Sequence, residues 1–228
     1  MESMQLKIEA GAAVFVKTIG LSPLKTRLAK TVGEGLAHEF YKRSCATIQS
    51  VLLSSNSIVP YWAIAEGEGG YEYWSSKMGK MEQGGGCLGM RLNFVYEVLL
   101  GQYGKAILMG ADAPQISPSL IHNAIDLSND GSFVVGPARD GGFYLLLGSK
   151  PIDLDLWLGV PYSASNTLDS LVGKLEKIAP VKYLEPLGDV DVIDDIPNLS
   201  KDLSKLESPL DLQRSLNTWL EKLTLLEK

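Results

Sequence analysis

The sequence predicts an α/β fold in which a largely parallel β-sheet is covered on both faces by helices. Short apolar runs at residues 12–16, 106–109 and 133–135 alternate along the chain with segments of helical periodicity, the pattern of such a sheet. The 228 residues are 45% hydrophobic and 21% charged, which excludes collagen-like, low-complexity and disordered classes. A chain of this length can bury a sizeable core without cross-links, so we expect one domain.

The first half of the chain predicts three strands separated by helices. The uninterrupted apolar run at 12–16 is typical of a buried strand. Thr31 and Glu34 have the spacing of a capping box, and apolar residues at helical intervals follow, so we expect one helix from Thr31 to about residue 53. The next expected elements are a strand at 58–65, a loop at 67–86 with a short helix near 71–77, a helix at 88–100 and a strand at 106–109.

The second half predicts further alternation and a final helix. Ser117 and Pro118 are a cap followed by a proline, which starts a helix. Beyond it we expect strands at 133–135 and 143–147, a helix at 163–178, an extended segment at 181–184, an acidic loop at 188–197 and a leucine-striped helix from Ser208. Because the sequence has no linker, we expect a single domain with a core at 11–199 and a C-terminal helical extension at 200–228.

Charge, cysteine content and hydropathy exclude several kinds of partner. The formal net charge of −6 argues against nonspecific binding to nucleic acid or to an anionic membrane, but it allows a locally basic pocket for a phosphorylated ligand. Cys45 and Cys87 are too few for a disulfide framework or a zinc site and indicate reduced thiols. Residues 1–9 lack the apolar core of a signal peptide, and no stretch approaches the ~18 apolar residues of a membrane span. We therefore expect a soluble, cytoplasmic protein.

Polar clusters follow three of the predicted strands. Lys17, Lys25 and Arg27 come after the first strand, Asp112 after a central one and Asp140 after a later one. Ligands of open parallel sheets bind outside the carboxyl ends of the strands. We therefore expect these clusters to share one binding site.

The loop after the first strand has the composition of a phosphate site. Gly20 lets backbone N–H groups approach a ligand, and Lys25 and Arg27 can neutralise the oxygens of a di- or triphosphate. The loop matches neither the P-loop nor the glycine pattern of dinucleotide-binding folds. A solvated basic turn before a helix is the alternative interpretation.

Carboxylates in the later clusters are candidate metal ligands. One or two carboxylates together with substrate phosphates commonly hold Mg²⁺ or Mn²⁺, so Asp112 is a candidate, and Asp189 and Asp191 could supply a second ligand. The alternatives are an Asx turn or helix cap at Asp112, a hairpin turn at Asp140-Gly141 and a solvated acidic loop at 188–197.

Four segments of the sequence point to a known family. They are FVKTIGLSPLKTRLA at 15–29, GADAP at 110–114, GPARDGGFY at 136–144 and DVD at 189–191. These segments resemble the glycosyltransferase-A-like family often labelled radical-SAM/selenodomain-associated transferase, which is related to the guanylyltransferases of molybdenum-cofactor and phospholactate metabolism. The resemblance extends from about residue 12 to residue 199 and implies a three-layer α/β/α nucleotide-diphospho-sugar transferase fold with a mostly parallel, mixed sheet.

The resemblance also implies roles for individual residues. It suggests that Asp112 and Asp191 bind Mg²⁺ or Mn²⁺. The residues expected to bind the nucleotide and its phosphates are Lys17, Gly20, Lys25, Arg27 and Arg91. The residues expected to line the acceptor or sugar side are Asp140, Gly141 and Gly142.

This chain departs from the family's pattern at three positions. Ile19 stands where proline is usual. In the segment GCLGMR at 86–91, Cys87 and Met90 replace two acids of the usual GDLGER, while Arg91 is kept. If those acids bind base, sugar or acceptor in relatives, the specificity of this chain is altered or its activity is lost.

The leading interpretation is a metal-dependent transferase with a nucleotide-activated donor, foremost a nucleotide-sugar glycosyltransferase. Lys25, Arg27 and the metal ion would stabilise the departing diphosphate, and Asp140 would be the base for a small-molecule acceptor that the sequence does not identify. Sugar transfer is favoured because the basic loop lacks the richer glycine run of nucleotidyltransferases. The alternatives are a nucleotidylyltransferase that takes a nucleoside triphosphate and releases pyrophosphate, and a non-catalytic nucleotide- or metabolite-binding protein.

Overall fold

A seven-stranded sheet forms the centre of the protein. The computed structural model describes residues 7–226, so most of the stretch 1–9 considered above lies outside the described residues. The order of the strands in the sheet is β3-β2-β1-β4-β6-β5-β7. Their bounds are β1 Ala10–Val16, β2 Ile58–Ile64, β3 Gly79–Glu82, β4 Ala106–Gly110, β5 Phe133–Pro137, β6 Phe143–Gly148 and β7 Val181–Tyr183.

The sheet is mixed but mostly parallel. Strand β1 pairs in parallel with β2 and β4, so that Val14 lies opposite Trp62 on one side and Met109 on the other. Strands β2 and β3 are also parallel, as are β5 and β7. Among the described strands, β6 alone runs in the opposite direction, because it is antiparallel to both β4 and β5. The carboxyl ends of the other six strands therefore point to the same edge of the sheet.

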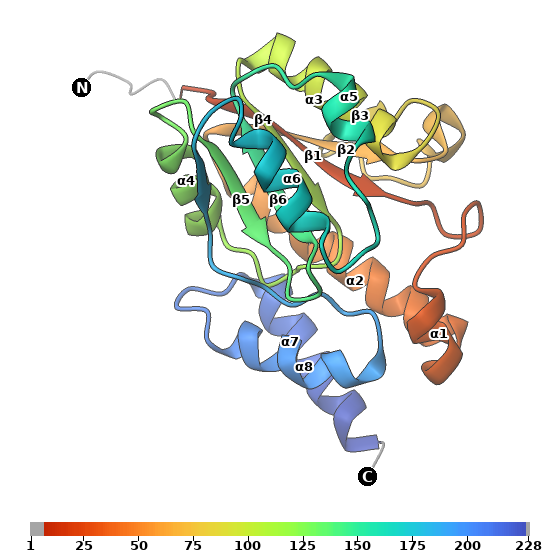
Figure 1. The fold of residues 1–228 in the computed structure, drawn as a ribbon. Helices are drawn as coiled ribbons and strands as arrows, with labels where there is room; N and C mark the ends of the chain where they lie inside the picture. The colour runs from red at the N-terminus through yellow and green to blue at the C-terminus, as the bar shows by residue number, and fades with distance from the viewer. Residues whose placement is uncertain (1–6, 227–228) are drawn as a thin grey trace.

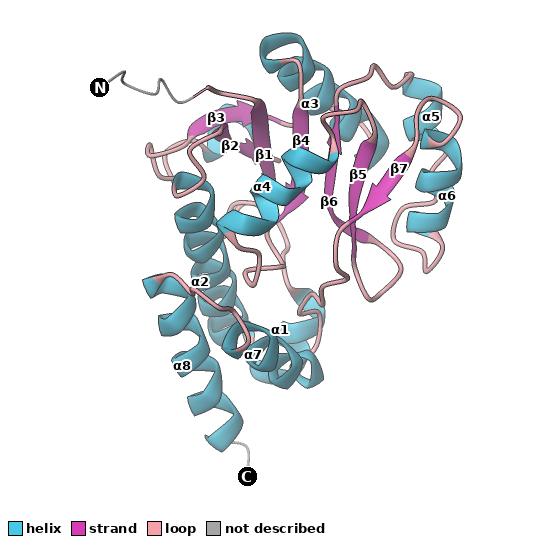
Figure 2. Cartoon of the chain, turned by 90° about the vertical axis from the view of Figure 1, so that its left-hand side faces the viewer, coloured by secondary structure: helices cyan, strands magenta, loops and turns pink. Residues whose placement is uncertain are grey.

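Helices cover both faces, which confirms the three-layer α/β/α architecture (Figure 1 and Figure 2). Helices α2 and α4 pack on one face, and α3, α5 and α6 pack on the other. The bounds of the helices are α1 Thr26–Val32, α2 Glu34–Leu53, α3 Leu88–Tyr103, α4 Pro118–Leu127, α5 Leu154–Leu158, α6 Thr167–Leu175, α7 Ile196–Ser204 and α8 Asp211–Leu226. In the described part of the chain, no helix combines the length and the apolar character needed to cross a membrane.

Alternation of side chains along the strands fills two separate cores. Ile107 points to the α2 and α4 side, where Ile48 and Ile121 are buried. The next residue of β4, Leu108, points to the opposite side and joins the cluster that includes Trp157 of α5. Successive residues of a strand face opposite sides of the sheet, so a strand buried on both faces must be apolar throughout.

A third cluster joins the C-terminal helices to the carboxyl edge of the sheet. Leu28 of α1, Phe40 of α2, Ile196 of α7 and Leu216 of α8 are buried together. In Figure 1, α7 and α8 lie together below the sheet, and Figure 2 shows α8 running alongside α2. The Nε2 amide of Gln213 donates to the carbonyl oxygens of Pro114 and Ile116, at 3.2 and 2.7 Å. The C-terminal extension thus packs on the core, and its membership of one domain stays a prediction.

The capping box predicted at Thr31 and Glu34 is wrong. Thr31 lies inside α1, which ends at Val32, and α2 starts at Glu34 after Gly33. Gly33 adopts φ +82° and ψ 155°, a conformation that residues with a side chain rarely adopt, and it breaks the predicted single helix in two. The expected segment is therefore two helices joined at a glycine.

Other boundaries also differ from expectation. The short helix expected at 71–77 is absent from the described structure; this segment forms turns, preceded by a 3-10 helix at Gly67–Gly70 and followed by β3, which was not expected. Packing explains the turns, because the ring of Trp74 lies 4.6 Å from that of Trp62 and its Nε1 donates to Thr18 Oγ1 at 3.0 Å. Aromatic contacts distant in sequence here outweigh the local propensity.

The remaining differences concern the last third of the chain. The helix expected at 163–178 is shorter, because it starts at Thr167 and ends at Leu175. The hydroxyl of Thr167 is 2.7 Å from the carbonyl oxygens of both Pro161 and Ala164, which ties the preceding residues into a loop. The expected acidic loop at 188–197 contains a 3-10 turn at Ile193–Asp195, and the helices α5 and α7 were not expected at all.

Candidate functional site

The expected site residues gather at the carboxyl edge of the sheet. Lys25 and Arg27 follow β1, Asp112 follows β4, and Asp189 and Asp191 follow β7. Asp140 reaches the same edge in the turn between β5 and β6, where the N–H of Ala138 donates to the carbonyl of Gly142 at 3.0 Å. The fold thus brings together residues that are separated by more than 160 positions in the sequence.

Lys25 is the centre of this cluster. Its backbone is left-handed, with φ 46° at the residue before α1, and its side chain is only 5% exposed. The Nζ atom lies 2.9 Å from Asp112 Oδ1 and 3.9 Å from Asp191 Oδ1, and it donates to the carbonyl of Val190 at 2.5 Å. The ring of Phe40 lies 5.8 Å away, close enough for a cation–π contact. One buried ammonium group therefore links the segments after β1, β4 and β7.

Arg27 extends the cluster toward solvent. Its Nη1 atom donates to Asp191 Oδ2 at 2.9 Å, while 73% of its side chain remains exposed. The backbone at Asp191 is fixed by Asp195, whose Oδ2 accepts the N–H groups of Asp191 and Val192, both at 2.9 Å. Asp191 thus faces two cations at once, and the guanidinium group of Arg27 is open to a ligand.

The geometry of Asp112 and Asp191 fits a shared cation. Both carboxylates approach the same atom, Lys25 Nζ, which shows that they face a common point. Asp112 Oδ1 is buried, and within the described residues it accepts no hydrogen bond of normal geometry. In that same part of the chain no group of three or more His, Cys, Asp or Glu side chains forms a metal site. The pair therefore suits an ion that completes its coordination with water and phosphate oxygens, as Mg²⁺ does.

A polar cavity of about 390 Å³ adjoins Arg27 and Asp191. Asp140, Asp189 and Arg139 also line it. Burial, together with the negative charges of Asp140 and Asp191, raises the pKa of Asp189 to about 6. The Nη1 atom of Arg139 lies 3.1 Å from Asp202 Oδ2, so its charge is already paired. The cavity thus places carboxylates beside the exposed guanidinium group of Arg27.

Asp140 occupies a tight turn, which confirms the hairpin interpretation of Asp140-Gly141. Its Oδ1 accepts the N–H of Gly142 at 2.8 Å. Gly141 has φ +91°, and a Cβ atom there would collide with the carbonyl oxygen of Ser165. Only glycine fits this position, so the turn and the loop before α6 pack directly against each other.

Three predicted phosphate contacts lie elsewhere in the structure. Lys17 is exposed and donates to the carbonyl of Pro23 at 3.3 Å. Gly20 lines a different cavity, of about 540 Å³, together with His38. Arg91 donates to the carbonyl of Gly86 at 3.1 Å and to Gln83 Oε1 at 3.3 Å, so it supports the glycine loop before α3. Among the described residues, no hydrogen bond or ion pair joins these three residues to Lys25, Asp112 or Asp191, and their binding of phosphate stays a prediction.

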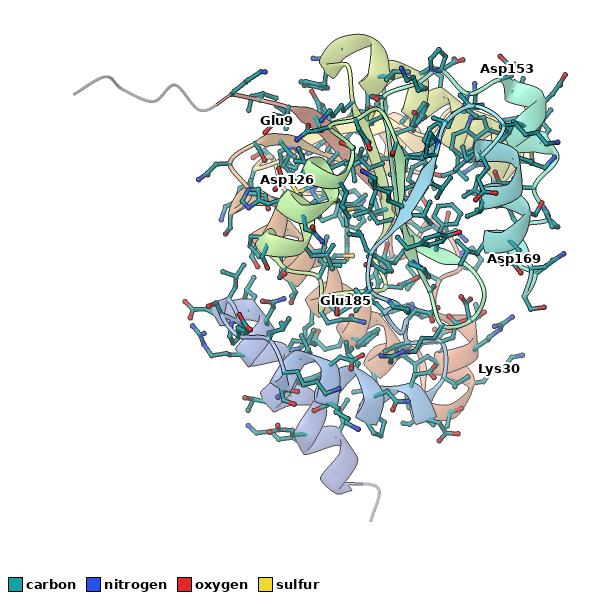
Figure 3. All side chains as sticks on the ribbon, turned by 60° about the vertical axis from the view of Figure 1, so that its left-hand side comes forward. Glu9, Lys30, Asp126, Asp153, Asp169 and Glu185 are labelled. Carbon is teal, nitrogen blue, oxygen red and sulfur yellow. The ribbon has the colours of Figure 1, made fainter. Side chains whose placement is uncertain are left out.

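The edge contains groups that sequence reasoning missed. Nothing in the sequence marks the carbonyl of Val190, the charge pair of Arg139 with Asp202, or the support of Asp191 by Asp195. Lys30, which follows Arg27 on α1, is exposed (Figure 3). The dense acidic composition of 188–197 was the one available signal for Asp195.

Solved structures similar to this chain share its fold. A "putative nucleotide-diphospho-sugar transferase" from Desulfovibrio desulfuricans G20 is 22% identical, with a TM-score of 0.80 over 94% of this chain and 98% of that one. A 4-diphosphocytidyl-2C-methyl-D-erythritol synthase from Anaerococcus prevotii DSM 20548 is 11% identical, with a TM-score of 0.55 over 87% of this chain and 97% of that one. A cytidylyltransferase from Leptospira borgpetersenii serovar Hardjo-bovis is 14% identical, with a TM-score of 0.54 over 96% of each chain.

At these identities the similarity shows the fold alone, and the fold is the one expected for a nucleotide-diphospho-sugar transferase. No curated protein matches the sequence. A family model does match residues 47–164, just over half of the chain, a range that includes Asp112 and Asp140. The protein belongs to the DUF2064 family of uncharacterized proteins conserved in bacteria.

Proposed function

We propose that the protein is a metal-dependent transferase with a nucleotide-activated donor, and that this donor is a nucleotide sugar. The main support is the connected cluster of Lys25, Arg27, Asp112 and Asp191 at the carboxyl edge of the sheet. Open α/β sheets bind ligands at this edge. The Desulfovibrio protein, which has the same fold, is named as a "putative nucleotide-diphospho-sugar transferase", which agrees with this choice of donor. We also propose that the protein is cytoplasmic and that it is one of the radical-SAM/selenodomain-associated transferases.

The cationic residues would bind the diphosphate. Arg27 presents exposed N–H donors beside the 390 Å³ cavity, and a guanidinium group can hold phosphate oxygens in bidentate fashion. Lys25 supplies a fixed positive charge next to it. Fixed cations assist most where negative charge develops, which in glycosyl transfer is on the departing diphosphate.

Asp112 and Asp191 would hold Mg²⁺ or Mn²⁺. When bound, the ion supplies further positive charge to the diphosphate. Because Lys25 Nζ lies between the two carboxylates, the chain itself keeps them directed at one point before any ion binds. Asp195 and Gln115 support this arrangement: Asp195 accepts the N–H of Asp191, and the Nε2 amide of Gln115 donates to the carbonyl of Gly188 at 2.6 Å.

Asp140 would activate the acceptor, a small molecule with a hydroxyl group. In this step the carboxylate of Asp140 takes the proton of an acceptor hydroxyl. The acceptor oxygen forms a bond to the anomeric carbon of the donor sugar. The bond between that carbon and the diphosphate oxygen breaks, and its electron pair leaves with the nucleoside diphosphate. Atoms and charge balance with a nucleotide sugar as the only co-reactant.

Nucleotidyl transfer is the second candidate. Two proteins with the same fold, a cytidylyltransferase and a diphosphocytidyl-methylerythritol synthase, favour it. Here an acceptor oxygen would attack the α-phosphorus of a nucleoside triphosphate, and pyrophosphate would leave with the electron pair of the broken P–O bond. Release of pyrophosphate from a triphosphate distinguishes this reaction from sugar transfer.

Thermal shift measurements test the proposal. The melting temperature is followed with nucleoside di- and triphosphates and nucleotide sugars, each with and without Mn²⁺, for the wild type and for Asp112→Asn. Asp126→Asn is the matched control, since Asp126 is exposed on α4, away from the site (Figure 3). We expect a nucleotide-sugar shift that needs both Mn²⁺ and Asp112. Changes in melting temperature that are the same without Mn²⁺ and in Asp112→Asn would contradict the proposal. Binding of a nucleotide sugar without formation of any product would indicate a non-catalytic protein.

A further inference from the structure

A second cavity meets the candidate site at Asp140. It has a volume of about 280 Å³ and lies between β1, β4, β6, α3 and the loop that precedes α6. Asp140 lines both this cavity and the polar cavity that contains Arg27 and Asp191. A molecule that fills the second cavity therefore has one end at the carboxylate of Asp140, beside the proposed diphosphate site.

The wall of this cavity is mostly apolar. Phe15 and Phe143 come from β1 and β6, Leu92 comes from α3, and Leu88 stands at the start of α3 with 43% of its side chain exposed. The aromatic ring of Tyr162 completes this wall. By contrast, the polar cavity on the other side of Asp140 is lined by charged groups.

The hydroxyl groups of two wall residues are already engaged within the protein. The hydroxyl of Tyr162 donates to the carbonyl of Trp157 at 3.1 Å. The hydroxyl of Thr167 donates to the carbonyls of Pro161 and Ala164 and accepts the N–H of Ala164 at 3.2 Å. Ser163 adds a third hydroxyl to the lining, but a sugar bound against the apolar side chains of this wall would leave most of its own hydroxyls without partners. That costs free energy, whereas an apolar group would not.

Gly110 leaves room for the ligand. It is the last residue of β4 and lies opposite Phe15 in the parallel register of β1 and β4. Because side chains alternate along a strand, position 110 faces the same side as Leu108, which packs with Leu92. A Cβ atom built at Gly110 would meet no described atom within 4 Å, and its φ is not among the positive values. The backbone does not require glycine here, so the missing side chain serves to keep the cavity open.

We propose that this cavity binds the apolar group of the acceptor. The acceptor is a hydroxyl-bearing molecule with an apolar group of about the size of one aromatic ring, and its hydroxyl faces Asp140. A volume of about 280 Å³ lies just below the ~300–1,000 Å³ range of small-molecule pockets, so the cavity has room for a group of at least one aromatic ring but not for a whole drug-sized ligand. The inference rests on the proposed function, because that function makes Asp140 the base for the acceptor.

Fluorine NMR tests the site without any nucleotide. The chain has five phenylalanines, so the protein labelled with 4-fluorophenylalanine gives few signals, which single Phe→Leu variants assign. Benzyl alcohol is the probe and glucose its polar counterpart. We expect saturable shifts of the Phe15 and Phe143 signals with benzyl alcohol, with a Kd on the order of millimolar for so small a ligand. The signals of Phe40 and Phe133, which are buried outside this cavity, should not move.

Two variants and one control separate occupancy of the cavity from indirect effects. Gly110→Val fills the cavity and should weaken benzyl alcohol binding about tenfold or more. Gly101→Val is the matched control: position 101 is exposed on α3, and a Cβ there also meets nothing within 4 Å. If Gly110→Val fails to fold, Leu88→Asp makes the rim polar at an exposed position and should weaken binding as well.

The possible results divide clearly. Phe15 and Phe143 shifts that disappear in Gly110→Val and persist in Gly101→Val support the inference. It is overturned if these signals do not move, if Gly110→Val binds as the wild type does, or if glucose shifts them equally. Because no nucleotide is present, failure here leaves the metal-dependent nucleotide shift standing. If the wild type binds benzyl alcohol but shows no metal-dependent change in melting temperature with nucleotide sugars, the proposed function is refuted and the apolar cavity still stands.

Discussion

Replacing Lys25 by methionine tests whether its ammonium group holds the candidate site together. Methionine keeps much of the length and the apolar stem of lysine but has no charge. In Lys25→Met the carboxylates of Asp112 and Asp191 lose the cation that lies 2.9 and 3.9 Å from them, and the carbonyl of Val190 loses its donor. Arg27 remains on the outer oxygen of Asp191, so the uncompensated charge falls mainly on Asp112.

The burial of the three side chains sets the size of the effect. Breaking a fully buried ion pair by removing one partner costs about 3–5 kcal/mol. Lys25 is 5% exposed, but Asp112 and Asp191 are 44% and 45% exposed, so water screens both carboxylates once the ammonium group is gone. We therefore expect the free energy of unfolding to fall by about 2 kcal/mol, or by about 4–8 °C in Tm for a chain of this length.

A double-mutant cycle in urea measures the coupling directly. The free energy of unfolding is compared for the wild type, Lys25→Met, Asp112→Asn and the double variant, with Lys30→Met as the exposed control on α1. We expect a coupling of about 1–2 kcal/mol between positions 25 and 112. We also expect Mn²⁺ to raise the Tm of Lys25→Met more than that of the wild type. A coupling under about 0.5 kcal/mol, or equal stabilisation by Mn²⁺, would refute the reasoning.

Three further predictions concern the backbone, the acidic cavity and the C-terminal helix. Gly33→Ala should lower the free energy of unfolding by about 1–3 kcal/mol, because only the backbone opposes a Cβ there, whereas Gly35→Ala inside α2 should be neutral or stabilising; similar urea midpoints would contradict this. The raised pKa of Asp189, about 6 instead of 3.8, means that its stabilising contribution is present below pH 4 and is lost as the pH rises through 6. The free energy of unfolding of Asp189→Asn, measured relative to that of the wild type in the same assay, should therefore increase as the pH rises from 4.5 to 7.5. A difference between the two proteins that does not change with pH would exclude the raised pKa of Asp189. Leu216→Ala should cost about 2–5 kcal/mol in one cooperative transition, and a separate transition at low urea would show that the C-terminal extension is not part of the same domain.

Helix-capping residues in the sequence predicted a helix start correctly only where the neighbouring residues adopt a compatible structure. At Ser117 the side chain accepts the N–H of Leu120 at 3.1 Å, and the helix starts at Pro118 as expected. At Thr31 the same kind of signal failed, because the chain had a stronger determinant two residues later in Gly33. A capping box stabilises a helix start only if the preceding residues are not already helical, and sequence alone did not show that α1 exists.

Elements that depend on partners distant in sequence were not predictable. Strand β3 is four residues long and only partly buried, with no alternating pattern, and it exists because β2 offers a free edge. Helix α7 follows an acidic segment, and its apolar face is completed by Leu28 and Phe40 from the other end of the chain. In both cases the deciding contacts join residues that no local window contains.

The position of the candidate site in the sheet was predictable from the sequence, but the ion pairs among its side chains were not. The rule that ligands meet the carboxyl ends of strands led us to expect Lys25, Asp112 and Asp140 at one edge of the sheet, and the strand order places them there. It could not show that Lys25 forms ion pairs with the two expected metal ligands, because these contacts depend on the left-handed backbone at residue 25 and on the chain after β7. It also could not show that Arg91 turns away to support the loop at 84–86.

The charge balance of the cluster gives a reason to expect metal dependence that is independent of the family. The charges of Lys25 and Arg27 are matched by those of Asp112 and Asp191, and Arg139 is paired with Asp202. Asp140 adds negative charge nearby, which together with burial raises the pKa of Asp189. A diphosphate that enters this site therefore meets no excess of positive charge, so its own charge must be balanced from outside the chain. A divalent cation held by Asp112 and Asp191 would supply that balance, and it would add to the positive charges of Lys25 and Arg27 beside the phosphates.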